Sequence, residues 1–157
     1  MSMSRVLGLY EKLSALPFGR AIFTRAITYK APYFASIKPE VLSLRPNHCA
    51  VLLRKHRAVE NHLGTVHVIA IVNALEMAMG TMAEASIPAH LRWIPKGMEV
   101  SYTAKATGDI TAFAEISADA WHQGPDVDIE VRATRPDGAV VVSGKIRLWV
   151  TERPAKG

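Results

Sequence analysis

Three side chains suited to acid–base and hydrogen-bond chemistry lie around the start of one apolar segment. Asn61 and His67 flank a short polar stretch that contains Gly64 and Thr65, and Glu76 follows nine residues after the histidine. A carboxylate can activate water or attack an acyl carbon directly, and an amide can orient the water or the substrate. The pattern therefore indicates a candidate site for acyl transfer at this point of the chain.

The segment after the polar stretch predicts a helix start that could bind an oxyanion. Thr65 is the expected N-cap, and the first free backbone N–H groups would lie between Val66 and Ile69. These N–H groups and the positive end of the helix dipole favour a polarised carbonyl or a tetrahedral oxyanion.

Each of these residues also has an ordinary structural interpretation. A histidine near a helix start more often caps or packs than acts as a base, so His67 could serve only the fold. Asn61 alone is a common turn residue. The polar positions of the helix fall close to one line and could simply face solvent; they are Asn73, Glu76, Gly80 and Glu84.

The helix that positions Glu76 is predicted to be buried and central. It runs from the polar stretch to about Ser86 and is apolar almost all round, and Pro88 ends it. A carboxylate in the middle of such a helix needs a partner, a polar cavity or a chemical role.

Strands are predicted on both sides of this helix. Residues 37–45 and 48–56 form two strands around a turn at Pro46-Asn47, and alternating residues from 98 to 150 predict a four-stranded antiparallel meander with hairpin signals such as Pro136-Asp137-Gly138. The inner face of the meander is rich in alanine, which would let a helix approach closely. We therefore expect an α+β domain in which the sheet wraps around the helix.

The N-terminal segment is predicted to form two amphipathic helices. Apolar residues recur at helical spacing in residues 4–15 and again after Pro17, where Phe18, Ile22, Ala26 and Tyr29 share one face. We expect these faces to pack on the domain. The first 40 residues hold six basic and two acidic side chains, +4 of the net charge of +5, so contact with a membrane surface is an alternative. The predicted division is 1–36 for the helices, 37–151 for the main domain and 152–157 for a short polar tail.

The composition is that of an ordinary globular chain. The 157 residues are 49% hydrophobic and 21% charged, which argues against disorder. The single cysteine, Cys49, is expected to be a buried thiol, and a cytoplasmic location is expected. The sequence has no metal-binding His-Glu-x-x-His or cysteine pair, no phosphate-binding glycine loop and no Gly-x-Ser-x-Gly elbow, so we expect neither a metal nor a cofactor.

The order of elements and the local spacing resemble the hotdog-fold acyl-CoA thioesterases, in particular those of the phenylacetyl-CoA type. In that family a turn asparagine precedes by six residues a histidine that opens the central helix, and an acidic residue follows nine residues later. Asn61, His67 and Glu76 stand at those places. The stretch from about 91 to 110, with Pro95-Lys96-Gly97-Met98, also resembles a poorly characterised branch of hotdog thioesterases. The resemblance covers roughly residues 37–150.

The resemblance implies a hotdog fold and hydrolysis of an acyl thioester to a carboxylic acid and CoA. Glu76 would be the general base or nucleophile, Asn61 would position the water or the thioester carbonyl, and backbone N–H groups near His67 and Val68 would form the oxyanion hole, beside Gly64 and Thr65. The chain departs from the family in two places. Val68-Ile69 replaces the usual pair of glycines after the histidine, and Glu76 replaces the aspartate common in that branch.

The resemblance also implies partners. The substrate would be an acyl-CoA or an acyl-carrier-protein thioester, and hotdog subunits pair edge to edge, so a homodimer or a dimer of dimers with sites at its interface is expected. The CoA phosphates would need basic residues, for which the candidates are Lys96, Lys105, Arg132 and Arg147.

Other functions remain open at this point. A non-catalytic hotdog protein that binds an acyl ligand or a membrane would suit Val68-Ile69 and the basic N-terminal helices. Hydroxyacyl-thioester dehydratases are also hotdog-fold proteins. Their local pattern is different, because the catalytic histidine lies in a Pro-rich or Asp-led loop, and we do not find such a loop in this sequence. Basicity alone would favour nucleic acid, and because no aromatic–basic interleaving is visible, we do not expect that partner.

Overall fold

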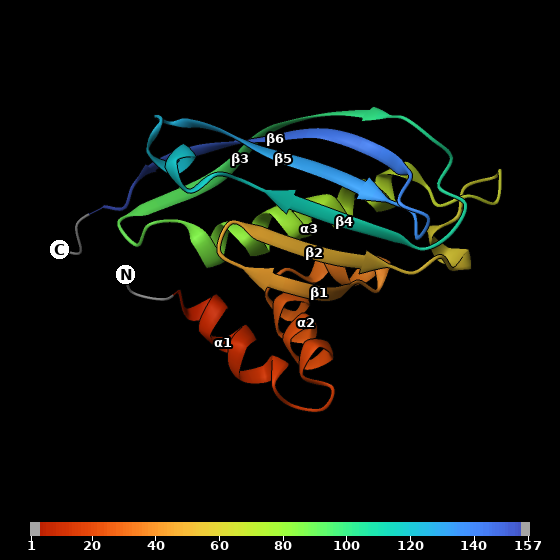
Figure 1. The fold of residues 1–157 in the computed structure, drawn as a ribbon, viewed down its shortest axis with the longest axis horizontal. Helices are drawn as coiled ribbons and strands as arrows, with labels where there is room; N and C mark the ends of the chain where they lie inside the picture. Colours follow the sequence, from red (N-terminus) through yellow and green to blue (C-terminus); the bar gives the residue numbers. More distant parts are fainter. Residues whose placement is uncertain (1–3, 155–157) are drawn as a thin grey trace.

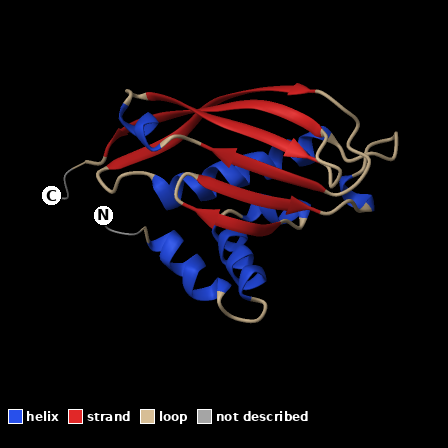
Figure 2. Cartoon of the chain, in the orientation of Figure 1, coloured by secondary structure: helices blue, strands red, loops and turns tan. Residues whose placement is uncertain are grey.

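The computed structural model of the chain describes residues 4–154 as a curved sheet over a long helix (Figures 1 and 2). The α-helices are α1 (Arg5–Ser14), α2 (Gly19–Lys30) and α3 (Val68–Ser86). The strands are β1 (Glu40–Arg45), β2 (His48–Leu53), β3 (Leu91–Tyr102), β4 (Ile110–Glu115), β5 (Asp126–Thr134) and β6 (Val140–Glu152). Short 3-10 helices are η1 (Pro32–Ile37), η2 (Arg57–Val59) and η3 (Ala118–His122).

The core lies between α3 and the concave face of the sheet. Ala74, Leu75 and Ala78 of α3 are fully buried, and the helix packs mainly on β2 and β4. Ala112 and Ala114 of β4 are also fully buried, and their small side chains allow this close approach. α3 has the length and composition of a membrane span, but most of it is buried inside the fold, which accounts for its apolar sequence. The predicted α+β architecture is confirmed.

The strand order corrects one prediction. The antiparallel sheet has the order β1-β2-β4-β5-β6-β3, so β3 and β4 are not neighbours and the predicted meander is wrong at its first turn. β3 instead pairs with β6, where Tyr102 lies opposite Val142, and β4 pairs with β2, where Ala112 lies opposite Val51. Alternation of apolar and polar residues assigns a face to each strand but does not choose its partner. Within residues 4–154, β1 and β3 are consequently the edge strands of the sheet.

α1 and α2 form a helical hairpin outside the sheet. α1 contacts α3 and α2 contacts β1, at the lower side of Figure 1. Phe23 is fully buried, with its ring edge-on to Tyr10 at 5.1 Å between centroids. The Thr24 hydroxyl accepts a hydrogen bond from the backbone N–H of Val41 at 2.9 Å, which ties α2 to the edge strand β1.

The predicted apolar face of α2 is largely wrong. Phe18, Ile22 and Tyr29 are exposed by 84%, 50% and 88%, and Phe23 and Thr24 face the domain instead. The turn between the helices sets this rotation, because a Cβ on Gly19 would overlap the backbone carbonyl of Leu13. Helical spacing shows which residues share one face of α2, whereas the tight turn at Gly19 determines which face is buried.

Candidate functional site

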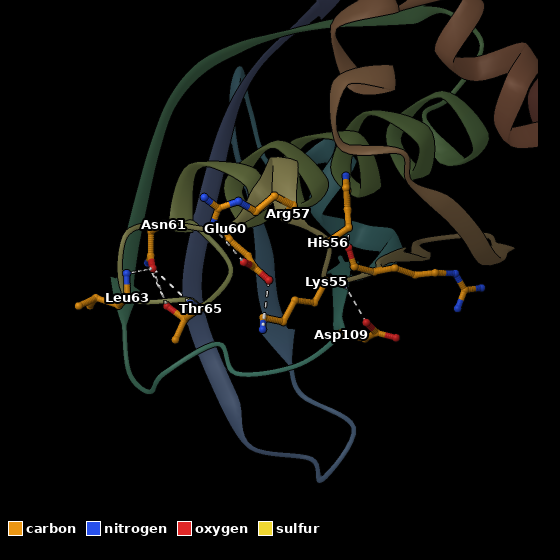
Figure 3. Close-up of polar contacts among 9 residues, drawn as sticks. Lys55, His56, Arg57, Glu60, Asn61, Leu63, Thr65 and Asp109 are labelled. Atoms are coloured by element: carbon orange, nitrogen blue, oxygen red, sulfur yellow. Dashed lines mark hydrogen bonds and ion pairs between the residues drawn. The ribbon is translucent and has the colours of Figure 1, made fainter.

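A tight turn before α3 is organised by the side chain of Asn61 (Figure 3). Its Oδ1 accepts the backbone N–H groups of Leu63 at 3.0 Å and Thr65 at 3.2 Å, and its Nδ2 donates to the Thr65 hydroxyl at 2.9 Å. Gly64 has a φ of +71°, in the left-handed region that glycine adopts without strain. Asn61 therefore shapes the turn and keeps one further Nδ2 hydrogen to donate.

The residue that caps α3 is His67, and the prediction of Thr65 as the N-cap is wrong. His67 has extended backbone angles, and its Nδ1 accepts the backbone N–H of Ile69 at 3.1 Å. The ordinary capping role considered for this histidine is thus present. Because Nδ1 is an acceptor, a neutral ring carries its proton on Nε2, on an exposed side chain.

The amides at the helix start differ in whether they have an acceptor. The N–H of Val66 donates to the carbonyl of Ala106 at 2.9 Å, and the N–H of His67 donates to that of Val59 at 2.7 Å. The N–H of Ile69 donates to Nδ1 of His67 in the helix cap. Within residues 4–154 the N–H of Val68 has no acceptor, and it lies at the positive end of a 19-residue helix. The predicted stretch of oxyanion donors is therefore reduced to one clear candidate.

This amide lies beside a cavity that we call the loop pocket. The cavity has a volume of about 300 Å³. Its polar lining includes Asn61, Thr65, His67, Tyr102 and Lys105, and Val68 and Ile71 form part of its apolar wall. The side chain of Val68 packs against the hydrophobic core, so its bulk contributes to that wall while its N–H remains without an acceptor.

Glu76 lines a different cavity, which we call the carboxylate groove. This groove of about 400 Å³ lies between the N-terminal helices, α3 and β3. Glu76, Gly80 and Glu84 of α3 line it, and the apolar walls include Phe34 and Trp93. Glu84 accepts a hydrogen bond from the Trp93 indole at 2.9 Å, whereas no such partner fixes Glu76 within the described part of the chain.

One copy of the chain does not bring the predicted catalytic groups together. Glu76 follows His67 by nine positions along α3, a rise of about 13.5 Å along the axis. A nucleophile and its oxyanion donors must lie within about 3 Å of one reacting group. Asn61, His67 and Val68 share the loop pocket, and Glu76 lines the carboxylate groove.

The four candidate CoA-phosphate residues lie in different surroundings, and Arg147 pairs with Asp128 at 2.7 Å. Lys96 pairs with Asp126 at 2.9 Å, and Arg132 pairs with Glu115 at 3.1 Å. Lys105 lines the loop pocket and makes no ion pair within residues 4–154. Of the four, Lys105 is the cation placed to meet an anion bound at the helix start.

Other titratable groups are tuned by their surroundings but lie away from both cavities. Burial raises the pKa of the Cys49 thiol to about 12, so the predicted buried thiol is confirmed and remains protonated. A hydrogen bond from Arg147 holds the pKa of Asp128 at about 2. Burial, followed by the charge of Arg45, lowers the pKa of His48.

The loop pocket also contains residues that the sequence did not indicate. Tyr102, Val141 and Val142 line it because β6 pairs with the end of β3. The expected hairpin between residues 107 and 110 would have placed other side chains beside Tyr102. Tyr102, Val141 and Val142 can be assigned to one pocket only when β3 is known to pair with β6.

Comparisons with known proteins give the family and the fold. A model of the family described as "Domain of unknown function (DUF4442)" matches residues 19–150. The crystal structure of the protein called genomics APC5556 is 42% identical, with a TM-score of 0.82, and the match covers 93% of this chain and 97% of that one. No curated protein matches the chain.

Two more distant structures carry thioesterase names. The Pseudomonas aeruginosa protein PA5026, described as a probable thioesterase, is 20% identical with a TM-score of 0.72, covering 81% of this chain and 91% of that one. A hypothetical thioesterase protein from Streptococcus pneumoniae, crystallised with coenzyme A, is 16% identical with a TM-score of 0.63, covering 82% and 99%. These similarities confirm the predicted hotdog fold.

Proposed function

Because the chain belongs to the DUF4442 family and has the hotdog fold, we propose that it is an acyl-CoA thioesterase. The observation that carries the proposal is the Val68 N–H, which has no acceptor in residues 4–154 and lies beside His67 in the loop pocket. Such a donor at a helix start is suited to the oxyanion that forms when a thioester carbonyl is attacked.

The proposed reaction divides the work between two kinds of group. Glu76 takes a proton from water, and the water oxygen forms a bond to the thioester carbon. The carbonyl oxygen becomes negative and accepts hydrogen bonds from the Val68 N–H and from Nε2–H of His67. When the tetrahedral intermediate collapses, the C–S bond breaks, the sulfur leaves as CoA thiolate, and the proton on Glu76 neutralises it. Direct attack by the Glu76 carboxylate is the alternative first step.

A second copy of the chain would complete this site. β3 is an edge strand, and its Trp93 lies against Gly80 in the carboxylate groove, whereas Tyr102 at its other end lines the loop pocket. If two copies pair antiparallel through β3, Tyr102 of one copy lies near Trp93 of the other. The loop pocket of each copy then lies beside the carboxylate groove of its partner, with Glu76 facing a partner's Val68 N–H.

The linings of the two cavities support a substrate class. The carboxylate groove is walled by Val6, Ile27, Phe34, Met79 and Trp93, which suits an apolar acyl chain. Lys105 in the loop pocket is available to a CoA phosphate. The Streptococcus pneumoniae relative crystallised with coenzyme A gives independent support for a CoA thioester, rather than a free ester, as the substrate.

Release of thiol from a panel of short, long and aryl acyl-CoAs tests the proposal. We expect turnover by the wild type and at least ~100-fold less by Glu76→Ala and Glu76→Gln, which corresponds to about 2.7 kcal/mol of barrier. Glu84→Gln is the matched control, because it changes the other carboxylate of the groove and keeps an acceptor for Trp93.

The possible results separate the reaction from the site. Turnover that does not depend on Glu76 would keep the reaction and refute the assigned base. No turnover of any thioester by a folded protein would refute the proposed thioesterase activity. That result would favour the alternative, a non-catalytic hotdog protein that binds an acyl ligand.

A further inference from the structure

The helical hairpin of α1 and α2 exposes an unusual share of the molecule's large apolar side chains. Of the twelve that are markedly exposed in residues 4–154, five belong to the hairpin and its turn, namely Leu9, Leu16, Phe18, Ile22 and Tyr29, and a sixth, Tyr33, lies in η1 directly after it. Phe18 and Tyr29 are more than four-fifths exposed. Scattered single apolar residues are normal on a surface, but a concentration of this kind on one element marks an interaction site.

Cations share the same exposed stripes. On α2, Phe18, Ile22, Arg25 and Tyr29 follow one another at helical spacing, and all are exposed. On α1, the exposed stripe is Arg5, Leu9 and Lys12, and the exposed Leu16 follows in the turn after the helix. Each stripe therefore mixes apolar or aromatic groups with basic ones, a composition that suits the boundary between lipid headgroups and acyl chains.

The positive charge of the hairpin is largely uncompensated. Arg20 pairs with Glu40 at 4.0 Å, but within residues 4–154 no ion pair involves Arg5, Lys12, Arg25, Lys30 or Lys38. Arg25 and Lys38 line an open groove of about 780 Å³ beside Tyr29. Glu40 also lines this groove but pairs with Arg54 at 2.7 Å, so the two free cations are available to a phosphate headgroup.

The turn between α1 and α2 presents its apolar residues outward. It lies at the lower end of Figure 1, away from the sheet. Phe18 has a φ of 59°, a left-handed conformation that an aromatic residue rarely adopts, and the residue is 84% exposed. The N–H of Gly19 donates to the carbonyl of Leu16 at 3.0 Å, and the N–H of Ile22 donates to that of Phe18 at 3.1 Å, so the backbone of the turn is held in place.

We propose that the α1–α2 hairpin docks this protein on an anionic lipid bilayer. Leu16, Phe18 and Ile22 enter the interfacial layer, and Lys12 and Arg25 contact the lipid phosphates. Complementary charge distinguishes this partner from a second copy of the chain, because two copies meeting through this surface would bring unpaired cations together. These five docking residues line neither cavity of the proposed thioesterase site, so the proposal does not depend on that activity.

Co-sedimentation with vesicles tests the proposal with the full chain. We expect binding to vesicles of phosphatidylcholine with phosphatidylglycerol, little binding to phosphatidylcholine alone, and loss of binding at high salt, since the screening length falls from about 10 Å at 0.1 M to about 3 Å at 1 M. Phe18→Asn with Ile22→Gln should weaken binding at least tenfold. Asparagine suits the left-handed position, and glutamine is a good helix former, so the hairpin should still fold.

Two controls keep the outcome clear. Val140→Gln changes an exposed aliphatic residue of β6, and Arg57→Glu reverses an exposed charge of η2; both should bind as the wild type does, whereas Arg25→Glu should bind more weakly. Circular dichroism and turnover of a soluble thioester should be unchanged in the Phe18/Ile22 variant. Absence of wild-type binding, or binding that ignores Phe18, Ile22 and Arg25, would overturn the proposal. A changed oligomeric state of the variant in sedimentation velocity would also overturn it, in favour of a contact between copies.

Discussion

Nδ1 of His67 accepts the backbone N–H of Ile69 at 3.1 Å, so one imidazole caps α3 and, in its neutral form, carries its proton on Nε2 at a residue that lines the loop pocket. The two roles can be separated by substitution. His67→Asn should retain the cap, because asparagine is among the best N-cap residues, whereas His67→Ala should reduce the free energy of unfolding by about 1 kcal/mol.

If the imidazole also donates to the oxyanion, both His67 variants should lose thioesterase activity to a similar extent, although only one of them loses stability. Denaturant unfolding and steady-state kinetics on the same preparations check this. Full activity in His67→Asn would restrict the histidine to its capping role.

Proline at position 68 would test the oxyanion donor itself. Val68 is the first residue of α3, where proline is well tolerated, and His67 already has the extended backbone that a residue before proline prefers. Val68→Pro removes the N–H and should lower kcat by about 100- to 1,000-fold.

Val68→Ala is the matched control, because it shortens the side chain and keeps the N–H. We expect its kcat to stay within about tenfold of the wild type. Equal losses in the two variants, measured with proteins of equal helix content, would show that the side chain rather than the amide matters.

Mixing two inactive variants tests whether the site is shared between copies. Glu76→Ala lacks the base, and Val68→Pro lacks the donor. In a dimer with shared sites, random re-association of equal amounts gives heterodimers with one intact site, and thus about a quarter of wild-type activity. Activity that remains at the sum of the two separate variants after subunit exchange would place the complete site within one copy.

His48 predicts a pH dependence of stability that is independent of the function. Its Nδ1 is buried without a partner in residues 4–154, its Nε2 lies 3.5 Å from Glu115, and Arg45 and Arg132 oppose its protonation. Burial is the main cause of its lowered pKa. The unfolded chain therefore binds this proton at higher pH than the folded chain, and stability is lost as the pH falls below about 6.5.

Urea unfolding at about pH 7.5 and about pH 5 measures this effect. The wild type should lose more stability between the two values than His48→Gln, which cannot take up the proton. A variant with an equal or steeper loss would assign the pH dependence to other groups.

Much of the fold could be predicted from particular residues. An almost continuous apolar surface from Val68 to Met82, ended near Pro88, identified α3 and its burial, and alternating residues identified most strands. The partner of β3 could not be obtained this way, because the same alternation on Met98, Val100 and Tyr102 is compatible with a neighbour on either side.

The candidate site was predictable in its residue types but not in its arrangement. Spacing brought Asn61, His67 and Glu76 to attention, but it did not show that the N–H groups of His67 and Val66 donate to Val59 and Ala106, which leaves Val68 as the amide without an acceptor in residues 4–154. Those partners come from segments that sequence spacing does not connect. The rotation of α2 was missed for a similar reason, since a backbone contact at Gly19 determines it.

The rise of about 13.5 Å between His67 and Glu76 has a kinetic consequence if the two residues of one copy cannot act on the same thioester group. Catalytic sites would then be produced by an encounter between chains, and the rate per chain would vary with the concentration of the protein itself. In dilute solution the specific activity would fall although every chain remained folded, and raising the protein concentration would restore it. Expression level would thus act as a control on turnover, without any effector molecule.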